Sequence, residues 1–288
     1  MARISTRHLS PVPETLLIPL LGRACESEKP HGILRDPKAQ EIVARLDYDF
    51  SRFELAPTLW ASCVRTRLMD GYLQQLLQRY PGATVVEIGC GLNTRYERLA
   101  TGQGVWFDLD VPEVHELWQQ FFVSHDRRRF MATSAYDLRW LDCVAEVAQG
   151  PYIFVAEASL IYFDAADNRR LFAALAERFP GSFIIFDSVR ASMIHQQGWH
   201  DALRHCRARL QWELDDINEL QTWAVGFRLI DQLTFCLPPK ALHDLYPSLW
   251  LHQMQWLDWV RPDITRSYFM NFGQLGTTPP ASPPPGRS

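Results

Sequence analysis

The chain has 288 residues, of which 47% are hydrophobic and 22% are charged, a balance typical of a globular protein with a core of useful size. Its 29 basic and 33 acidic residues give a formal net charge of −4, whereas a protein that binds the nucleic-acid backbone usually carries a basic excess. We therefore expect no nucleic-acid partner.

Six cysteines lie far apart in the chain, and none forms a Cys-x-x-Cys pair. This usage is typical of reduced thiols in a cytoplasmic protein, so we predict neither a disulfide framework nor a metal site. The first ten residues lack the apolar core of a signal peptide, and the apolar stretch at 16–21 is too short to span a bilayer. We expect no membrane partner.

Residues 1–82 are predicted to form an N-terminal helical cap. Leucines recur at helical spacing in residues 16–21, and a longer apolar pattern extends from Leu59 to Leu77. The tripeptide Tyr-Pro-Gly at 80–82 ends that pattern.

Residues 83–190 have the pattern of a Rossmann-like α/β core. Short runs rich in Val, Ile and Phe alternate with amphipathic segments, which indicates a mainly parallel sheet with helices on both faces. The predicted strands are 84–88, 105–109, 152–156 and 182–187, with a weaker strand at 130–133. The predicted helices are 94–100, 111–124, 138–147 and 165–179.

The remaining segment, 191–276, is assigned to the same domain. Its expected elements are a helical stretch at 190–215, a strand at 227–236, a helix at 239–259 and a closing strand at 267–275. The two strands would add an antiparallel hairpin to the sheet. Residues 277–288 form a Pro-rich tail that we expect to be disordered.

The sharpest local feature is a Gly-x-Gly turn after the first core strand. Gly89 and Gly91 follow an apolar run, and Asn93 or Thr94 can cap the helix that comes next. Glycines at such a turn let the backbone approach a ligand, which lies beyond the carboxyl ends of the strands in a doubly wound sheet. Many loops carry two glycines for turn geometry alone, so this motif needs a second signal.

Asp108 and Asp110 supply the second signal at the end of the next strand. About twenty residues after the glycines, an acidic side chain can hold the hydroxyls of a nucleotide ribose. Without the upstream glycines, both would be interpreted as solvated loop carboxylates. An NAD enzyme would carry a third glycine near Thr94. The pattern therefore favours S-adenosylmethionine, which has ribose and adenine but no pyrophosphate.

Four motifs, in order, resemble those of the leucine carboxyl methyltransferase family. They are VVEIGCGLNTRYERL from Val85, FDLDVPEV from Phe107, YDLR from Tyr136 and VAEASLIYF from Val155. The resemblance runs through residues 58–190 and points to the family's bacterial branch, O-methyltransferases that tailor polyketides and related natural products. It implies a class I methyltransferase fold with a seven-stranded sheet and S-adenosylmethionine as cofactor. Asn93 and Cys90 depart from the family's usual Asp and Ala, and neither is expected to disturb cofactor binding.

The resemblance implies cofactor contacts for several residues. Arg65 matches an arginine that clamps the cofactor's carboxylate, for which a bidentate guanidinium is suited. Gly89 and Gly91 would pass beneath the methionine part. Asp110 would accept the ribose hydroxyls, with Asp108 as the alternative if the alignment is shifted by two residues.

Further contacts follow from the same resemblance. Asp137 would take the adenine amino group and Leu138 would pack on the ring, although Asp137 can also cap a helix. Glu157 would lie near the cofactor's amino group or sulfonium, where a carboxylate is electrostatically favourable. Tyr162 is a candidate for the methyl-transfer site and equally a candidate core residue. Arg23 would add a second contact from the front helices.

The last third of the chain is rich in histidine and tryptophan. A carboxylate acceptor needs no base at pH 7, whereas a phenol benefits from one, and no histidine pairing is visible in the sequence. We therefore name no catalytic base. The histidines are His195, His200, His205 and His252. The tryptophans Trp199, Trp212, Trp223, Trp250, Trp256 and Trp259 could form an aromatic wall, but such residues more often pack in cores and interfaces.

These features together predict an S-adenosylmethionine-dependent O-methyltransferase that acts by in-line transfer on a small molecule. The acceptor group would be a carboxylate or a phenol or enol hydroxyl, and residues 191–276 would supply the acceptor side. The alternatives are a methyltransferase of protein C-terminal carboxylates, an NAD-linked oxidoreductase and a binding module that no longer catalyses. The sequence leaves the oligomeric state open.

Overall fold

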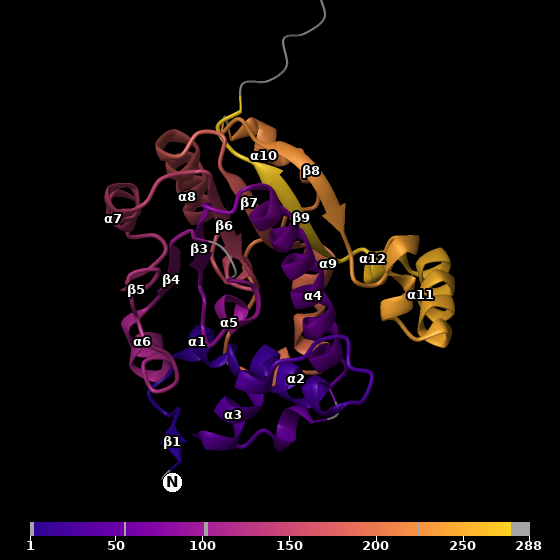
Figure 1. Cartoon of the computed structure of the whole chain (residues 1–288). Coiled ribbons are helices and arrows are strands. Elements are labelled where there is room, and N and C mark those ends of the chain that lie inside the picture. Colours follow the sequence, from indigo (N-terminus) through magenta and orange to yellow (C-terminus); the bar gives the residue numbers. More distant parts are fainter. Residues whose placement is uncertain (1–2, 55, 101–102, 224, 278–288) are drawn as a thin grey trace, which may run out of the picture.

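The computed structural model describes residues 3–54, 56–100, 103–223 and 225–277, and its centre is a seven-stranded sheet (Figure 1). The strands are β3 (Thr84–Ile88), β4 (Trp106–Asp110), β5 (Arg128–Ala132), β6 (Tyr152–Ala156), β7 (Phe183–Val189), β8 (Arg228–Leu233) and β9 (Tyr268–Gln274). Their order is β5-β4-β3-β6-β7-β9-β8. The first five are parallel, and β9 runs antiparallel to both β7 and β8. The predicted parallel sheet with a C-terminal antiparallel hairpin is confirmed.

Helices cover both faces of the sheet, which explains why its strands are almost continuously apolar. On one face, Val86 and Ile88 of β3 join a core with α7 (Trp140–Val147) and α8 (Ala165–Arg178). On the other face, Val85 packs in a second core with α4 (Pro57–Arg79). The short helices α5 (Arg95–Leu99) and α6 (Pro112–Trp118) follow β3 and β4.

The N-terminal region is mainly helical, as predicted. It contains α1 (Pro11–Glu14), α2 (Leu17–Glu28), α3 (Pro37–Arg45), the 3₁₀ turn η1 (Ser51–Phe53) and α4. Helix α2 packs against both α3 and α4. The two-residue strands β1 (Ile4–Ser5) and β2 (Leu46–Asp47) pair in parallel as a separate small sheet. The division of the chain at residues 82, 190 and 276 stays a prediction.

The long helix predicted at 190–215 is wrong. The segment contains only α9 (Ala191–Gln196) and the 3₁₀ turns η3 (Gln197–Trp199) and η4 (Leu203–His205), followed by extended chain. Its buried residues Ala208, Leu210, Trp212 and Leu214 alternate, which is the period of a strand. The backbone N–H groups of Gln211 and Leu214 donate to Ile161 and Val189 carbonyls, so they take no part in a helix.

The helix predicted at 239–259 is interrupted. A 3₁₀ segment, η5 (Lys240–Leu245), comes first, and α11 (Ser248–Val260) begins only after Pro247. Proline has no backbone N–H to continue the earlier turn, so it starts a new helix instead. The remaining elements are η2 (Leu160–Tyr162), α10 (Glu219–Thr222) and α12 (Pro262–Thr265).

Of the predicted disordered tail, only Thr277 is among the described residues, and its backbone N–H donates to the Gly226 carbonyl. The prediction for 278–288 lies outside the described part. Within the described ranges, no helix combines the length and apolar character needed to cross a membrane.

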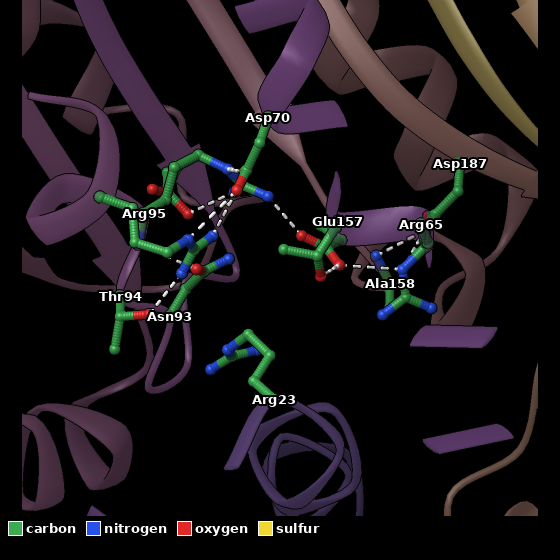
Figure 2. Close-up of polar contacts among 12 residues, drawn as sticks. Arg23, Arg65, Asp70, Asn93, Thr94, Arg95, Glu157, Ala158 and Asp187 are labelled. Atoms are coloured by element: carbon green, nitrogen blue, oxygen red, sulfur yellow. Dashed lines mark hydrogen bonds and ion pairs between the residues drawn. The ribbon is translucent and has the colours of Figure 1, made fainter. Parts of the chain in front are cut away.

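A buried arginine joins four elements beneath the carboxyl ends of the strands (Figure 2). Arg95 of α5 is fully buried, and its Nε lies 2.7 Å from Oδ1 of Asp70 in α4. Its Nη1 lies 2.8 Å from Oε2 of Glu87 in β3, and its Nη2 contacts Glu157 just after β6. A charge this deep must be paired, because solvent cannot compensate for its lost hydration. Arg95 therefore fixes α4 and α5 against β3 and β6.

Replacing Arg95 by methionine would leave buried carboxylates without their partner. We expect Arg95→Met to lower the free energy of unfolding by about 3–5 kcal/mol, measured by urea denaturation. Burial already raises the pKa of Glu87 to about 7, against the opposing effect of Arg95. In the variant, folded Glu87 binds a proton that the unfolded carboxyl releases, so the loss of stability should be larger at pH 8 than at pH 6.

The matched control is Arg139→Met, because the Arg139 side chain is exposed in its contact with Asp137. This control should leave the urea midpoint almost unchanged. If Arg95→Met does not fold, Arg95→Lys, which keeps the charge but loses the guanidinium fork, should show a smaller loss in the same direction. Equal stability of Arg95→Met and Arg139→Met would contradict the role given to Arg95.

Candidate functional site

A cavity of about 530 Å³ lies at the carboxyl ends of β3, β4 and β6, and residues of α1, α2 and α4 line it from the N-terminal region. Seven of the residues for which the sequence predicts a cofactor or acceptor contact line this cavity: Arg23, Arg65, Gly89, Gly91, Asp110, Glu157 and Tyr162. The cavity lies where a doubly wound fold binds its ligands. The structure therefore brings these residues together, while their individual roles stay predictions.

The turn after β3 depends on its glycines. Gly89 and Gly91 have φ values of 69° and 52°, a region that other residues rarely adopt. A Cβ on Gly89 would lie 2.5 Å from Cβ of Ser159, so a side chain there would also collide with the loop after β6. Asn93 ends the turn, since its Oδ1 accepts a hydrogen bond from the backbone N–H of Arg95 at 3.0 Å.

Asp110 connects the glycine turn to the end of β4. Its Oδ2 accepts from the Gly91 N–H at 2.7 Å, and its Oδ1 accepts from the Val111 N–H at 2.8 Å. Each oxygen keeps a lone pair for a further donor, which suits a ribose diol. Burial raises the pKa of Asp110 to about 6, and the two backbone N–H groups oppose that rise.

Asp108, the alternative to Asp110, faces elsewhere. It is buried, and its Oδ2 accepts from Nε of Arg128 at 2.7 Å. It does not line the cavity, whereas Asp110 does. The geometry therefore favours Asp110 for the ribose.

Arg65 and Glu157 form a buried ion pair on the cavity wall (Figure 2). Nε of Arg65 lies 3.0 Å from Oε1 of Glu157, which also accepts from Oγ1 of Thr66 at 2.7 Å. Burial alone would raise the pKa of Glu157, but Arg65 and Arg95 hold it well below its usual range. Glu157 is therefore a fixed negative charge beside the cavity.

Arg65 also contacts the neighbouring strands β7 and β9. Its Nη1 donates to Oη of Tyr268 in β9 at 3.1 Å, and its Nε lies 3.8 Å from Oδ2 of Asp187 in β7. Asp187 Oδ2 further accepts from the backbone N–H of Ala158 at 2.7 Å, which holds the loop after β6. These contacts orient Arg65, so that a ligand carboxylate would meet a preformed cation.

Arg23 adds a second buried guanidinium on the side of α2. Its Nε lies 2.9 Å from Oδ2 of Asp36, and its Nη2 donates to the Leu92 carbonyl at 3.0 Å. Figure 2 shows Arg23 directed from its helix toward the space between Asn93 and Glu157. Its lining position agrees with a second contact to an anionic group, although that role stays a prediction.

Asp137 and Leu138 do not line the cavity, and their predicted contacts with adenine stay predictions. Asp137 binds Arg139 at the surface, with its Oδ1 2.8 Å from Nε, and this partner lowers its pKa to about 2. Leu138 packs on the hydrophobic core instead. The structure offers Thr133, Ser134 and Ala135 at this end of the cavity. These three residues directly follow β5, and that position could have indicated them, because ligands bind at the carboxyl ends of the strands in this fold.

Beyond these polar groups, the same cavity has an apolar region. We define it by Ile18, Ile161, Met193, Leu203, Leu210 and Phe235, which come from α2, the loop after β6, the segment after β7 and the loop after β8. Tyr162 lies on this wall and is buried, and burial raises the pKa of its hydroxyl to about 12. Tyr162 therefore acts in the structure as a neutral wall residue.

His200 is the one histidine of the four considered that lines the cavity. His195, His205 and His252 are exposed. None of the six tryptophans lines the cavity, so an aromatic wall built from them is wrong. Trp212 belongs to the hydrophobic core, Trp223 packs against that core, Trp250 packs on Trp60, and Trp199, Trp256 and Trp259 are exposed.

Comparisons with known proteins agree with this geometry. A model of the leucine carboxyl methyltransferase family matches residues 17–176. The tetracenomycin polyketide synthesis O-methyltransferase TcmP of Streptomyces glaucescens is 31% identical over 229 residues, which are 79% of this chain and 84% of that protein. The S-adenosyl-L-methionine-dependent methyltransferase dpfgK of Gibberella zeae is 28% identical over 242 residues, 76% of this chain and 81% of the relative.

The solved structures add evidence on the fold alone. The crystal structure of a DUF574 family protein from Streptomyces avermitilis aligns with a TM-score of 0.55 and 15% identity, over 88% of this chain and 96% of that one. Together with the sheet order, the expected class I methyltransferase fold is confirmed. The alternative of an NAD-linked oxidoreductase is excluded by the family match. The chain belongs to the leucine carboxyl methyltransferase family and is an S-adenosylmethionine-dependent methyltransferase.

Proposed function

We propose that this methyltransferase transfers the methyl group to an oxygen atom of a small, largely apolar molecule, polyketide-like or aromatic. The acceptor oxygen belongs to a carboxylate or to a phenol or enol hydroxyl. The polyketide O-methyltransferase TcmP, whose sequence covers most of this chain, supports the reaction type.

The observation that carries the proposal is the division of one cavity into two regions. Charged side chains gather at the strand ends, with Arg23, Arg65, Asp110 and Glu157 among them. The six residues that define the apolar region belong to, or pack against, one hydrophobic cluster, so this part of the lining is contiguous. A cofactor with a charged tail and a ribose fits the first region, and an apolar acceptor fits the second.

The bound cofactor supplies an electrophilic methyl group, so this chain's residues act mainly by positioning. Asp110 would hold the ribose hydroxyls through its two oxygens, while Arg65 and Arg23 offer cations to the cofactor carboxylate. The apolar region would exclude water from the acceptor oxygen and hold it in line with the methyl carbon. A water-poor site also strengthens the attraction between Glu157 and a nearby positive charge.

The direct test is incubation of the purified protein with methyl-labelled S-adenosylmethionine and matched pairs of acceptors. 2-Naphthoic acid and 2-naphthol share one apolar skeleton and differ in the oxygen group, and 2-naphthylamine replaces oxygen by nitrogen. We expect the label in a methyl ester or ether, identified by mass spectrometry, and none on the amine.

Other outcomes would contradict the proposal. Label on the amine alone would assign the enzyme to nitrogen. Label on peptides with a free C-terminal leucine, with none on the small acids and phenols, would favour the protein carboxyl methyltransferase. Binding of the cofactor without any transfer to these acceptors would favour a binding module.

The predicted ribose contact is tested by Asp110→Asn. The amide keeps the size of the side chain, but its NH₂ group cannot accept a hydrogen bond from Gly91 or from a ribose hydroxyl. We expect the affinity for S-adenosylhomocysteine, measured by calorimetry, to fall at least about tenfold, or ~1.4 kcal/mol. An unchanged dissociation constant would refute the assignment.

Asp110 should also make cofactor binding depend on pH. Its folded pKa is about 6, raised above the ordinary value, so its charged form is lost as the pH falls through 6. Protonation removes an acceptor from the ribose site, and we expect weaker S-adenosylhomocysteine binding at pH 5.5 than at pH 7.5. The weakening should be smaller in Asp110→Asn, and an identical pH dependence in both proteins would argue against this origin.

Asp137→Ala tests whether Asp137 contacts adenine, as the sequence predicts, or only binds Arg139 outside the cavity. Because Asp137 binds Arg139 outside the cavity, we expect S-adenosylhomocysteine affinity to change by less than about twofold, as for a surface ion pair. A loss of about tenfold would restore the sequence-based role.

A further inference from the structure

Tyr268, the first residue of β9, lines the cavity, although it belongs to none of the four sequence motifs. It is buried, and its ring packs on Phe235 of the apolar region, with the two ring centroids 5.6 Å apart. Its hydroxyl contacts the charged region instead, through Arg65. Tyr268 therefore lies at the border between the two regions of the cavity.

The hydrogen bonds of the Tyr268 hydroxyl can run in only one direction. Its Oη lies 2.5 Å from Oδ2 of Asp187 and 3.1 Å from Nη1 of Arg65. Burial raises the pKa of Asp187 to about 6, so this carboxylate is mainly ionised at pH 7.5, and burial raises the pKa of Tyr268 well above its usual value. A guanidinium can only donate and an ionised carboxylate can only accept. The hydroxyl proton therefore goes to Asp187, and an oxygen lone pair faces Arg65.

Asp187 holds the groups on both sides of this contact. It is fully buried in β7 and does not itself line the cavity. Besides the Tyr268 hydroxyl, its Oδ2 accepts from the backbone N–H of Ala158 at 2.7 Å (Figure 2). Ala158 follows Glu157 and has a φ of 50°, which is uncommon for a residue with a Cβ. The hydrogen bond to Asp187 therefore holds the loop that carries Glu157 in a strained conformation.

Stability of the fold alone does not explain Asp187. Its Oδ1 is buried and has no hydrogen-bond partner among the described residues, which is a cost to the folded state. An apolar side chain at this position of β7 would avoid that cost, but it would leave the Tyr268 hydroxyl and the Ala158 N–H without their acceptor. A buried group that is costly in this way is typical of a functional site, where it is kept for the geometry that it imposes.

Two fixed partners leave one end of Arg65 for a ligand. Its Nε donates to Glu157 and its Nη1 donates to Tyr268, whereas Nη2 has no hydrogen-bond partner in the described part of the chain. Because the guanidinium is planar, hydrogen bonds at two of its nitrogens fix the plane and with it the direction of the third nitrogen. Without the Tyr268 hydroxyl, only the hydrogen bond to Glu157 would remain, and the group could turn.

We propose that Tyr268, held by Asp187, is a positioning residue that directs Arg65 at the cofactor carboxylate and so makes the site select a ligand with an amino-acid tail. The inference rests on the cofactor contact proposed for Arg65, and it does not depend on which acceptor oxygen is methylated. Because Tyr268 and Asp187 act through Arg65, their removal weakens the binding of ligands that carry the carboxylate and leaves the binding of ligands without it unchanged.

The test compares two ligands that differ in this tail. S-Adenosylhomocysteine carries the carboxylate, whereas 5′-methylthioadenosine has the same adenine, ribose and thioether sulfur without it. In calorimetry at pH 7.5, we expect wild-type protein to bind S-adenosylhomocysteine at least about tenfold more tightly than 5′-methylthioadenosine. Tyr268→Phe should raise the Kd for S-adenosylhomocysteine about tenfold and change the Kd for 5′-methylthioadenosine by less than about twofold. A general loss of structure would weaken the binding of both ligands.

Tyr152→Phe is the matched control. The Tyr152 hydroxyl donates to the Ala148 carbonyl at 2.8 Å, and Tyr152 does not line the cavity, so this variant should bind both ligands as wild type does. If Tyr268→Phe does not fold, Asp187→Asn keeps the size of the side chain and removes its charge, and it should weaken the binding of S-adenosylhomocysteine alone, by about threefold or more. Where both variants fold, their combination should lose less than the product of the two single losses, because both residues act through Arg65.

Each contrary result identifies what has failed. Equal losses for both ligands in Tyr268→Phe, or no loss for either, would overturn the inference and leave the proposed O-methyl transfer intact. Equal affinity of the wild-type protein for both ligands would contradict the cofactor contact given to Arg65, and this inference with it. Label on the amine alone in the naphthyl assay would overturn the proposed acceptor and leave this inference standing.

Discussion

The site depends on two buried arginines that share one carboxylate. Glu157 accepts from Arg65 on one oxygen and from Arg95 on the other, so α4, α5 and the loop after β6 are fixed to one another. Breaking a buried pair is costly because an unpaired charge stays behind, which makes this arrangement hard to distort. Helix α4 is thereby fixed to the sheet, and α2 packs on α4, so that residues of both helices line the cavity.

The two regions of the cavity follow from this constraint. The parallel strands end in Asp110, Glu157 and the glycine turn, which give the sheet side of the cavity its polar groups. The cap and the segment after β7 give it apolar side chains and His200. A charged cofactor and a largely apolar acceptor can therefore bind side by side in one cavity, as methyl transfer between them requires.

The sequence predicted the sheet well where a strand is buried on both faces. β3 and β6 have the predicted bounds, because an apolar run is a local signal and Gly-x-Gly marks the end of β3. Asp110 lies beside that glycine turn, as the spacing predicts. The segment after β7 was mispredicted because its helical composition hides the alternate burial of Leu210, Trp212 and Leu214. For Asp137 the sequence could not indicate its surface partner Arg139, because that contact depends on the local turn geometry. The 3.5 Å contact between Nε2 of His200 and the Thr58 hydroxyl joins residues 142 positions apart, so it has no local signal in the sequence.

The most direct test of the account is a crystal structure of the protein with S-adenosylhomocysteine. It should show the ribose hydroxyls within hydrogen-bonding distance of both Asp110 oxygens, and the sulfur facing the apolar region defined by Ile161 and its neighbours. A ribose bound away from Asp110, or a sulfur turned toward the paired arginines, would contradict the division of the cavity on which the function rests.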